Sequence, residues 1–151
     1  MKTWIVVFAA LWACACGRRE AGAPEPGSDY MREVQQVLLE LRVLDKQIAS
    51  QVTADTIAAN TIVPLIRDQF RPALAGLRQR VAALQPDSAL TPVNEQLVRY
   101  LDLRLKAYDL AIQGEQEQRQ DLFEEFARLQ VQADAEGRSL EEEIRQARQR
   151  R

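Results

Sequence analysis

Cys14 and Cys16 are the most reactive side chains in the sequence, and they lie one residue apart near its start. A disulfide between them would close a strained ring. The sequence holds no other cysteine and no histidine. It therefore lacks the residues for thiolate or imidazole metal sites, covalently attached haem, Ser-His-Asp triads and Cys-His dyads. An enzyme built on this chain would have to work with carboxylates and arginine alone.

A second group of residues that could bind a ligand comprises Tyr100, Arg104 and Tyr108, which are spaced four apart along one side of a predicted helix. An arginine between two aromatic rings could form a ligand patch through cation–π contacts. Tyr108 also belongs to the apolar stripe of that helix, so packing within the core is the competing interpretation.

Carboxylates are frequent, but their spacing favours a solvated surface. Di-iron sites in helical bundles need Glu-x-x-His pairs, which a chain without histidine cannot supply. The runs Glu124-Glu125 and Glu141-Glu142-Glu143 fan around a helix and cannot converge on one ion. Isolated acids are expected to form ion pairs along helix faces, such as Asp102 with Arg99. The isolated acids considered are Asp45, Asp55, Asp68, Asp102 and Asp109. We therefore expect no enzymatic activity, no metal and no cofactor.

The two cysteines follow a segment with the format of a signal peptide. Lys2 precedes an apolar run of about ten residues, roughly half of the ~20 needed for a transmembrane helix. The run ends in Leu11-Trp12-Ala13-Cys14, which resembles the lipobox of bacterial lipoproteins, with Trp12 in place of the usual small residue. A second box ending at Cys16 lacks the aliphatic residue. We expect cleavage after residue 13 and lipidation of Cys14, with Cys16 as the alternative.

The lipobox resemblance implies a place in the cell envelope. Lipoproteins of this kind carry three acyl chains on the N-terminal cysteine, and two chains already give stable membrane anchoring. Ala15 follows Cys14, whereas an Asp there is the usual inner-membrane retention signal of enterobacterial lipoproteins. The resemblance thus favours the outer membrane, facing the periplasm, with the inner membrane as the alternative.

Composition and length divide the rest of the chain into a tether and one domain. Residues 14–28 carry the lipidated cysteine and a stretch rich in Gly, Pro and charge, typical of a flexible linker. Residues 29–151 are long enough for one hydrophobic core. The formal net charge of −2 gives no sign of a nucleic-acid partner.

The domain is predicted to be an all-α antiparallel bundle of three to four helices, because apolar residues recur every three or four positions. The first stripe comprises Tyr30, Val34, Val37, Leu41, Leu44 and Ile48. A break is expected between Thr53 and Pro64, and kinks are expected near Pro64 and Pro72. Thr91-Pro92 is typical of a helix start, with Thr91 as the cap. Gly114 is the expected turn before the last helix, and one continuous rod from Thr91 onward is the alternative.

We expect a membrane-anchored, non-enzymatic module that binds another envelope protein, and heptad-like spacing also permits a homo-oligomer. Overall, the chain resembles small helical envelope lipoproteins. The alternative is a periplasmic chaperone or a carrier of apolar ligands, which would hold clients between its helices. Leu90-Thr91-Pro92 and Gln96 partly resemble the LTxxQ signature of helical periplasmic stress chaperones, with the glutamine two places late.

Overall fold

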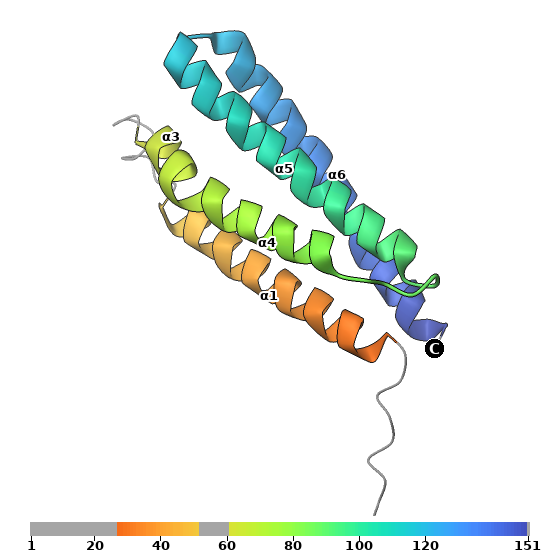
Figure 1. The fold of residues 1–151 in the computed structure, drawn as a ribbon. Helices are drawn as coiled ribbons and strands as arrows, with labels where there is room; N and C mark the ends of the chain where they lie inside the picture. The colour runs from red at the N-terminus through yellow and green to blue at the C-terminus, as the bar shows by residue number, and fades with distance from the viewer. Residues whose placement is uncertain (1–26, 52–60, 151) are drawn as a thin grey trace, which may run out of the picture.

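The computed structural model describes residues 27–51 and 61–150, and these residues form four helical segments without a strand. Successive segments run antiparallel, so that the start of α1 and the end of α6 lie at the same end of the bundle (Figure 1). The predicted all-α bundle is confirmed. Cys14, Cys16, the tether up to residue 26, Asp55 and the predicted break up to residue 60 lie outside the described residues.

Helix α1 spans Ser28–Gln51 and buries the stripe that its sequence predicts. Its buried residues are Tyr30, Met31, Val34, Val37, Leu41 and Leu44, and Ile48 packs partly buried beside them. Spacings of three and four residues place these side chains on one face of the helix, because a turn takes 3.6 residues. That face points into the bundle.

The second segment combines α3 (Ile62–Leu65), a π-helical turn (Ile66–Phe70) and α4 (Arg71–Ala83). Pro64 lies in the first turn of α3, where a helix needs no amide donor, and not at a kink within a helix. Pro72 cannot donate a hydrogen bond to the carbonyl of Asp68. Just before it, the Arg71 N–H bonds to the carbonyl of Ile66, five residues back. The irregularity expected near Pro72 therefore takes the form of one widened turn.

Helix α5 spans Thr91–Glu117, and its start matches the sequence except for the cap. The Thr91 hydroxyl donates to the carbonyl of Asp87 at 3.1 Å instead of capping the helix. The Asp87 carboxylate accepts the Leu90 N–H at 3.0 Å, three residues on, as a helix-capping side chain does. The prediction of Thr91 as the cap is wrong, because both the Leu90 N–H and the Thr91 hydroxyl donate to Asp87.

The turn between the last two helices lies four residues beyond the predicted Gly114. Helix α6 spans Gln120–Gln149, and Gln118 has a left-handed backbone with φ of 54°. The Arg119 N–H bonds to the Gly114 carbonyl at 2.9 Å, and the Gln118 N–H bonds to the Glu115 carbonyl at 3.4 Å. This pair of bonds is a Schellman motif. The chain is not one rod, and Gly114 belongs to the last turn of α5.

The core is filled by side chains from all four segments, and α5 is its most enclosed helix. Val93, Leu97, Leu101 and Ala107 of α5 are fully buried, and α5 packs against α3, α4 and α6. Leu122, Leu129, Ala133, Leu140, Ile144 and Ala147 face inward from α6. Within the described ranges, no helix combines the length and apolar character needed to cross a bilayer.

Candidate interaction groove

The structure brings Tyr100, Arg104 and Tyr108 together as the sequence predicts, but beneath the surface. The Arg104 side chain is only 9% exposed, and it donates to the Tyr100 hydroxyl at 3.1 Å and the Tyr108 hydroxyl at 3.3 Å. Its guanidinium carbon lies 5.7 Å from the centre of the Tyr100 ring. Asp45 of α1 completes the cluster with an oxygen 2.6 Å from Arg104 Nη2.

In this cluster the guanidinium of Arg104 is charged and the two phenols are neutral. Burial alone would lower the pKa of Arg104, but Tyr108, Tyr100 and Asp45 raise that pKa above its ordinary value, so the guanidinium stays charged. Burial raises the pKa values of Tyr100 and Tyr108. The cluster thus satisfies a buried charge by hydrogen bonds and joins α1 to α5.

Of the three predicted ligand-patch residues, Tyr100 also lines a surface cleft. This cleft of about 260 Å³ separates α1 from α6. Tyr100 lies close to Gly137, since a Cβ at Gly137 would come within 3.2 Å of the Tyr100 ring. The cleft walls are Leu38, Leu41, Arg42, Asp45, Asp134, Gly137, Arg138, Leu140 and Glu141. Charges of both signs line this cleft, so it offers no surface of one dominant chemistry.

A larger and more apolar groove of about 560 Å³ lies between α1 and α4. Leu39 and Val43 of α1 stand beside it with 55% and 49% of their surfaces exposed. Ala73 and Gly76 of α4 form its opposite side, and a Cβ added at Gly76 would meet nothing within 4 Å. We call this surface the α1–α4 groove; its remaining lining residues are Gln36, Glu40, Leu44, Gln47, Leu77 and Arg80.

Charged side chains bridge the two helices at one end of the α1–α4 groove. Arg80 donates to Glu40 at 2.6 Å and lies 3.6 Å from Glu33. Hydrogen bonds from Arg80 and Gln36 lower the pKa of the Glu40 carboxyl. These contacts place residue 80 of α4 between residues 33 and 40 of α1, and so establish which parts of the two helices lie at the same height.

The sequence pattern does not single out Leu39 and Val43. Both residues fall off the predicted stripe, although they are four residues apart and therefore share a second face of the same helix. A large apolar pair on the polar side of an amphipathic helix was the available signal. The structure also shows one large apolar side chain on the outer face of α6, Val131, which is 69% exposed.

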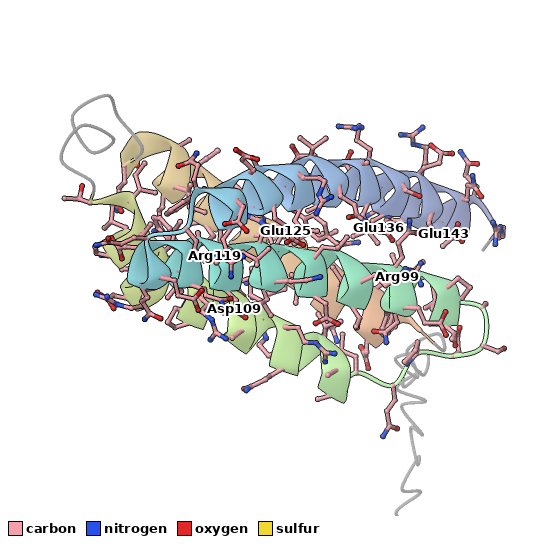
Figure 2. The ribbon with its side chains drawn as sticks, turned by 90° about the horizontal axis from the view of Figure 1, so that it is seen from above. Arg99, Asp109, Arg119, Glu125, Glu136 and Glu143 are labelled. Atoms are coloured by element: carbon pink, nitrogen blue, oxygen red, sulfur yellow. The ribbon has the colours of Figure 1, made fainter. Side chains whose placement is uncertain are left out.

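Three of the isolated acids, Asp45, Asp102 and Asp109, pair with arginines of other helices. Asp102 binds Arg78 of α4 at 2.8 Å, so the predicted pair with Arg99 is wrong. Arg99 instead faces Glu136 of α6 at 3.1 Å, where the two helices lie side by side (Figure 2). Asp109 pairs with Arg71, and Asp68 pairs with its neighbour Arg67. Within the part of the chain that the structure describes, no three Cys, His or acidic residues gather where they could hold a metal ion.

Gln96, the residue of the partial LTxxQ likeness, is buried and donates to the Ser139 hydroxyl at 2.6 Å. It thus links α5 to α6 inside the bundle.

No protein-family model matches the chain, and no curated protein or solved structure is significantly similar to it.

Proposed function

We propose that the chain is a lipid-anchored, non-enzymatic interaction module of the bacterial cell envelope, and that the α1–α4 groove is its docking surface. The single observation that carries the docking surface is the exposure of Leu39 and Val43 beside an apolar recess. Large apolar side chains gathered next to a groove mark interaction surfaces in soluble domains.

The anchor rests on the lipobox resemblance at Leu11-Trp12-Ala13-Cys14. Three acyl chains on Cys14, or on Cys16, would hold the domain at the membrane, which we propose is the outer membrane on its periplasmic side. Residues 17–28 would then act as a short spacer with an average reach of about 20 Å.

The many buried apolar side chains at the centre of the bundle favour an interaction module over a carrier of apolar ligands. A carrier needs an enclosed apolar cavity that buries most of its ligand. Here the side chains of all four segments occupy the centre of the bundle. The α1–α4 groove lies at the surface instead, where it suits another protein better than a small molecule.

Metabolic labelling with a fatty acid tests the anchor. Replacing Cys14→Ser should abolish labelling and membrane retention, whereas Cys16→Ser should leave both unchanged. The opposite pattern would assign the lipid to Cys16. Labelling or retention that survives replacement of both cysteines would refute the lipid anchor.

The apparent size of the chain after mild solubilisation from cells tests the docking surface. The wild-type chain should migrate as a complex, and Leu39→Arg should shift it to the size of a single chain, because an arginine in an apolar contact is left unpaired. Val131→Arg is the matched control, since it changes an exposed aliphatic residue outside the groove. A complex that survives Leu39→Arg would contradict the assignment of the groove.

A further inference from the structure

The α1–α4 groove places a protrusion and a recess side by side. The protrusion is Leu39 with Val43 on α1, and the recess is Ala73 with Gly76 on α4. Both belong to the same groove, and Arg80 contacts Glu33 and Glu40 from the neighbouring turn of α4. The protrusion and the recess therefore lie at about the same height along the bundle.

We propose that the occupant of this groove is a second copy of the same chain, related by a two-fold axis that runs parallel to the helices. This inference rests on the proposed docking surface and goes further by naming its partner. A two-fold interface is isologous, so one surface must fit itself. A face that carries its own protrusion and its own recess meets that condition.

The direction of the axis follows from the heights of the two features. Rotation about an axis parallel to the helices exchanges the α1 side with the α4 side and keeps every residue at its height. Leu39 and Val43 of one copy then meet Ala73 and Gly76 of the other, and the reverse contact forms at the same time. An axis perpendicular to the helices would instead lay α1 on α1 and leave both recesses empty.

Arg80 and its two carboxylate partners lie at one end of this face, and they already pair within their own chain. The contact between copies therefore rests on the apolar protrusion and recess, not on charge.

The size of the whole two-helix face is comparable to that of a standard interface. Helix α1 has 24 residues. At 1.5 Å per residue and about 10 Å per helix diameter, the two-helix face covers roughly 700 Å². A standard interface buries about 800 Å² on each partner. The parallel axis also directs both copies of Ser28 to the same end, so both tethers can reach one membrane.

Photo-cross-linking in cells that produce the full chain tests the proposal. A photoreactive amino acid at position 39 should give an adduct of about twice the mass of one chain, and two differently tagged copies should both be present in it. Peptide mapping should locate the cross-link between position 39 and the segment Ala73–Arg80 of the other copy. The same photoreactive residue at position 131 should give no such adduct.

A blocking variant adds a second measurement. Gly76→Arg should reduce the adduct formed from position 39 at least about tenfold, since the added side chain has open space within its own chain and fills the recess. Arginine also suits a helix, so the fold should persist. Val131→Arg should leave the adduct unchanged.

The other outcomes separate this proposal from the proposed function. An adduct with a different protein would overturn the second copy and leave the interaction module standing. Absence of any adduct from position 39 would overturn both. A cross-link from position 39 to α1 of the other copy would overturn the parallel axis.

Discussion

Arg104 carries a charge into the centre of an apolar helix face, and Asp45 is the carboxylate that neutralises it. Removing one partner of a buried ion pair leaves an uncompensated charge. Asp45 is half exposed, so water can partly replace it. We expect Asp45→Ala to lower the free energy of unfolding by about 1–3 kcal/mol in urea denaturation.

Asp109→Ala is the matched control for Asp45→Ala. Asp109 also joins an arginine of another helix, Arg71, but both side chains of that pair are about half exposed, whereas Arg104 is buried. An exposed pair contributes about 0–1 kcal/mol. Equal losses for the two variants would show that burial of Arg104 has no energetic consequence.

The buried tyrosines should make the free energy of unfolding depend on pH in the alkaline range. Burial, followed by the charge of Asp87, raises the pKa of Tyr30 from 10.0 to about 12, and burial also raises the pKa values of Tyr100 and Tyr108. The unfolded chain loses these protons first, so their stabilising contribution is complete below pH 10 and falls as the pH rises toward 12.

Tyrosinate absorbance and helical circular dichroism, followed together, measure this effect. We expect the phenols to ionise above pH 10 in step with loss of helix. Full ionisation near pH 10 with the helices intact would contradict the burial of all three rings.

At the residue scale, the sequence predicts the grouping of Tyr100, Arg104 and Tyr108, because positions four apart share a helix face. It could not predict that Arg104 is buried, since its partner Asp45 lies 59 residues away. Asp102 shows the same limit: spacing suggests Arg99 on the same helix, while the real partner, Arg78, belongs to another one.

At the scale of elements, the α5–α6 turn offers a test of backbone strain. Gln118 has a left-handed backbone at the position where helices commonly place glycine. Gln118→Gly should therefore stabilise the fold by about 0.5–1 kcal/mol, seen as a higher melting temperature. Gln116→Gly, two residues earlier within α5, should destabilise it by about 1 kcal/mol. A loss at both positions would contradict the left-handed conformation.

Substitution of two helical glycines by alanine is expected to change stability differently. Gly76 has no atom within 4 Å of an added Cβ, so Gly76→Ala should stabilise α4 by about 0.5–1 kcal/mol. A Cβ at Gly137 would come within 3.2 Å of the Tyr100 ring, whose hydroxyl accepts a hydrogen bond from Arg104. We expect Gly137→Ala to give no such gain, and thermal unfolding of the two variants compares them directly. An equal gain would show that Tyr100 moves freely.

The helices themselves could be predicted because their apolar stripes are regular, whereas their ends depend on single backbone contacts. Gly114 has the residue type of a turn, but a Cβ there would lie 3.1 Å from Phe123, so its small size serves the close approach of α6. The real turn falls at a glutamine, which carries no turn signal. The Thr91-Pro92 pair is itself typical of a helix start, so the sequence does not indicate that the Asp87 carboxylate accepts the Leu90 N–H instead.

At the scale of the whole molecule, packing between helices is uneven. Helix α5 has most of its backbone contacts with α6 and then with α4, whereas the extensive backbone contacts of α1 within the described residues are with α4. Regions with fewer close contacts open more easily. We expect backbone amides of α1 to exchange with deuterated water faster than those of α5, as measured by mass spectrometry. Equal protection would mean that the four segments open as one unit.

The even number of antiparallel segments returns the chain to the end where it started, so that the start of α1 and the end of α6 lie at one end and the α5–α6 turn lies at the other (Figure 1). Helix α6 has 30 residues, so these two ends are separated by about 45 Å. In a lipid-anchored chain, a reporter joined at the end of α6 would lie within the reach of the tether, about 20 Å, from the membrane. A reporter inserted in the α5–α6 turn could extend up to about 45 Å farther from it.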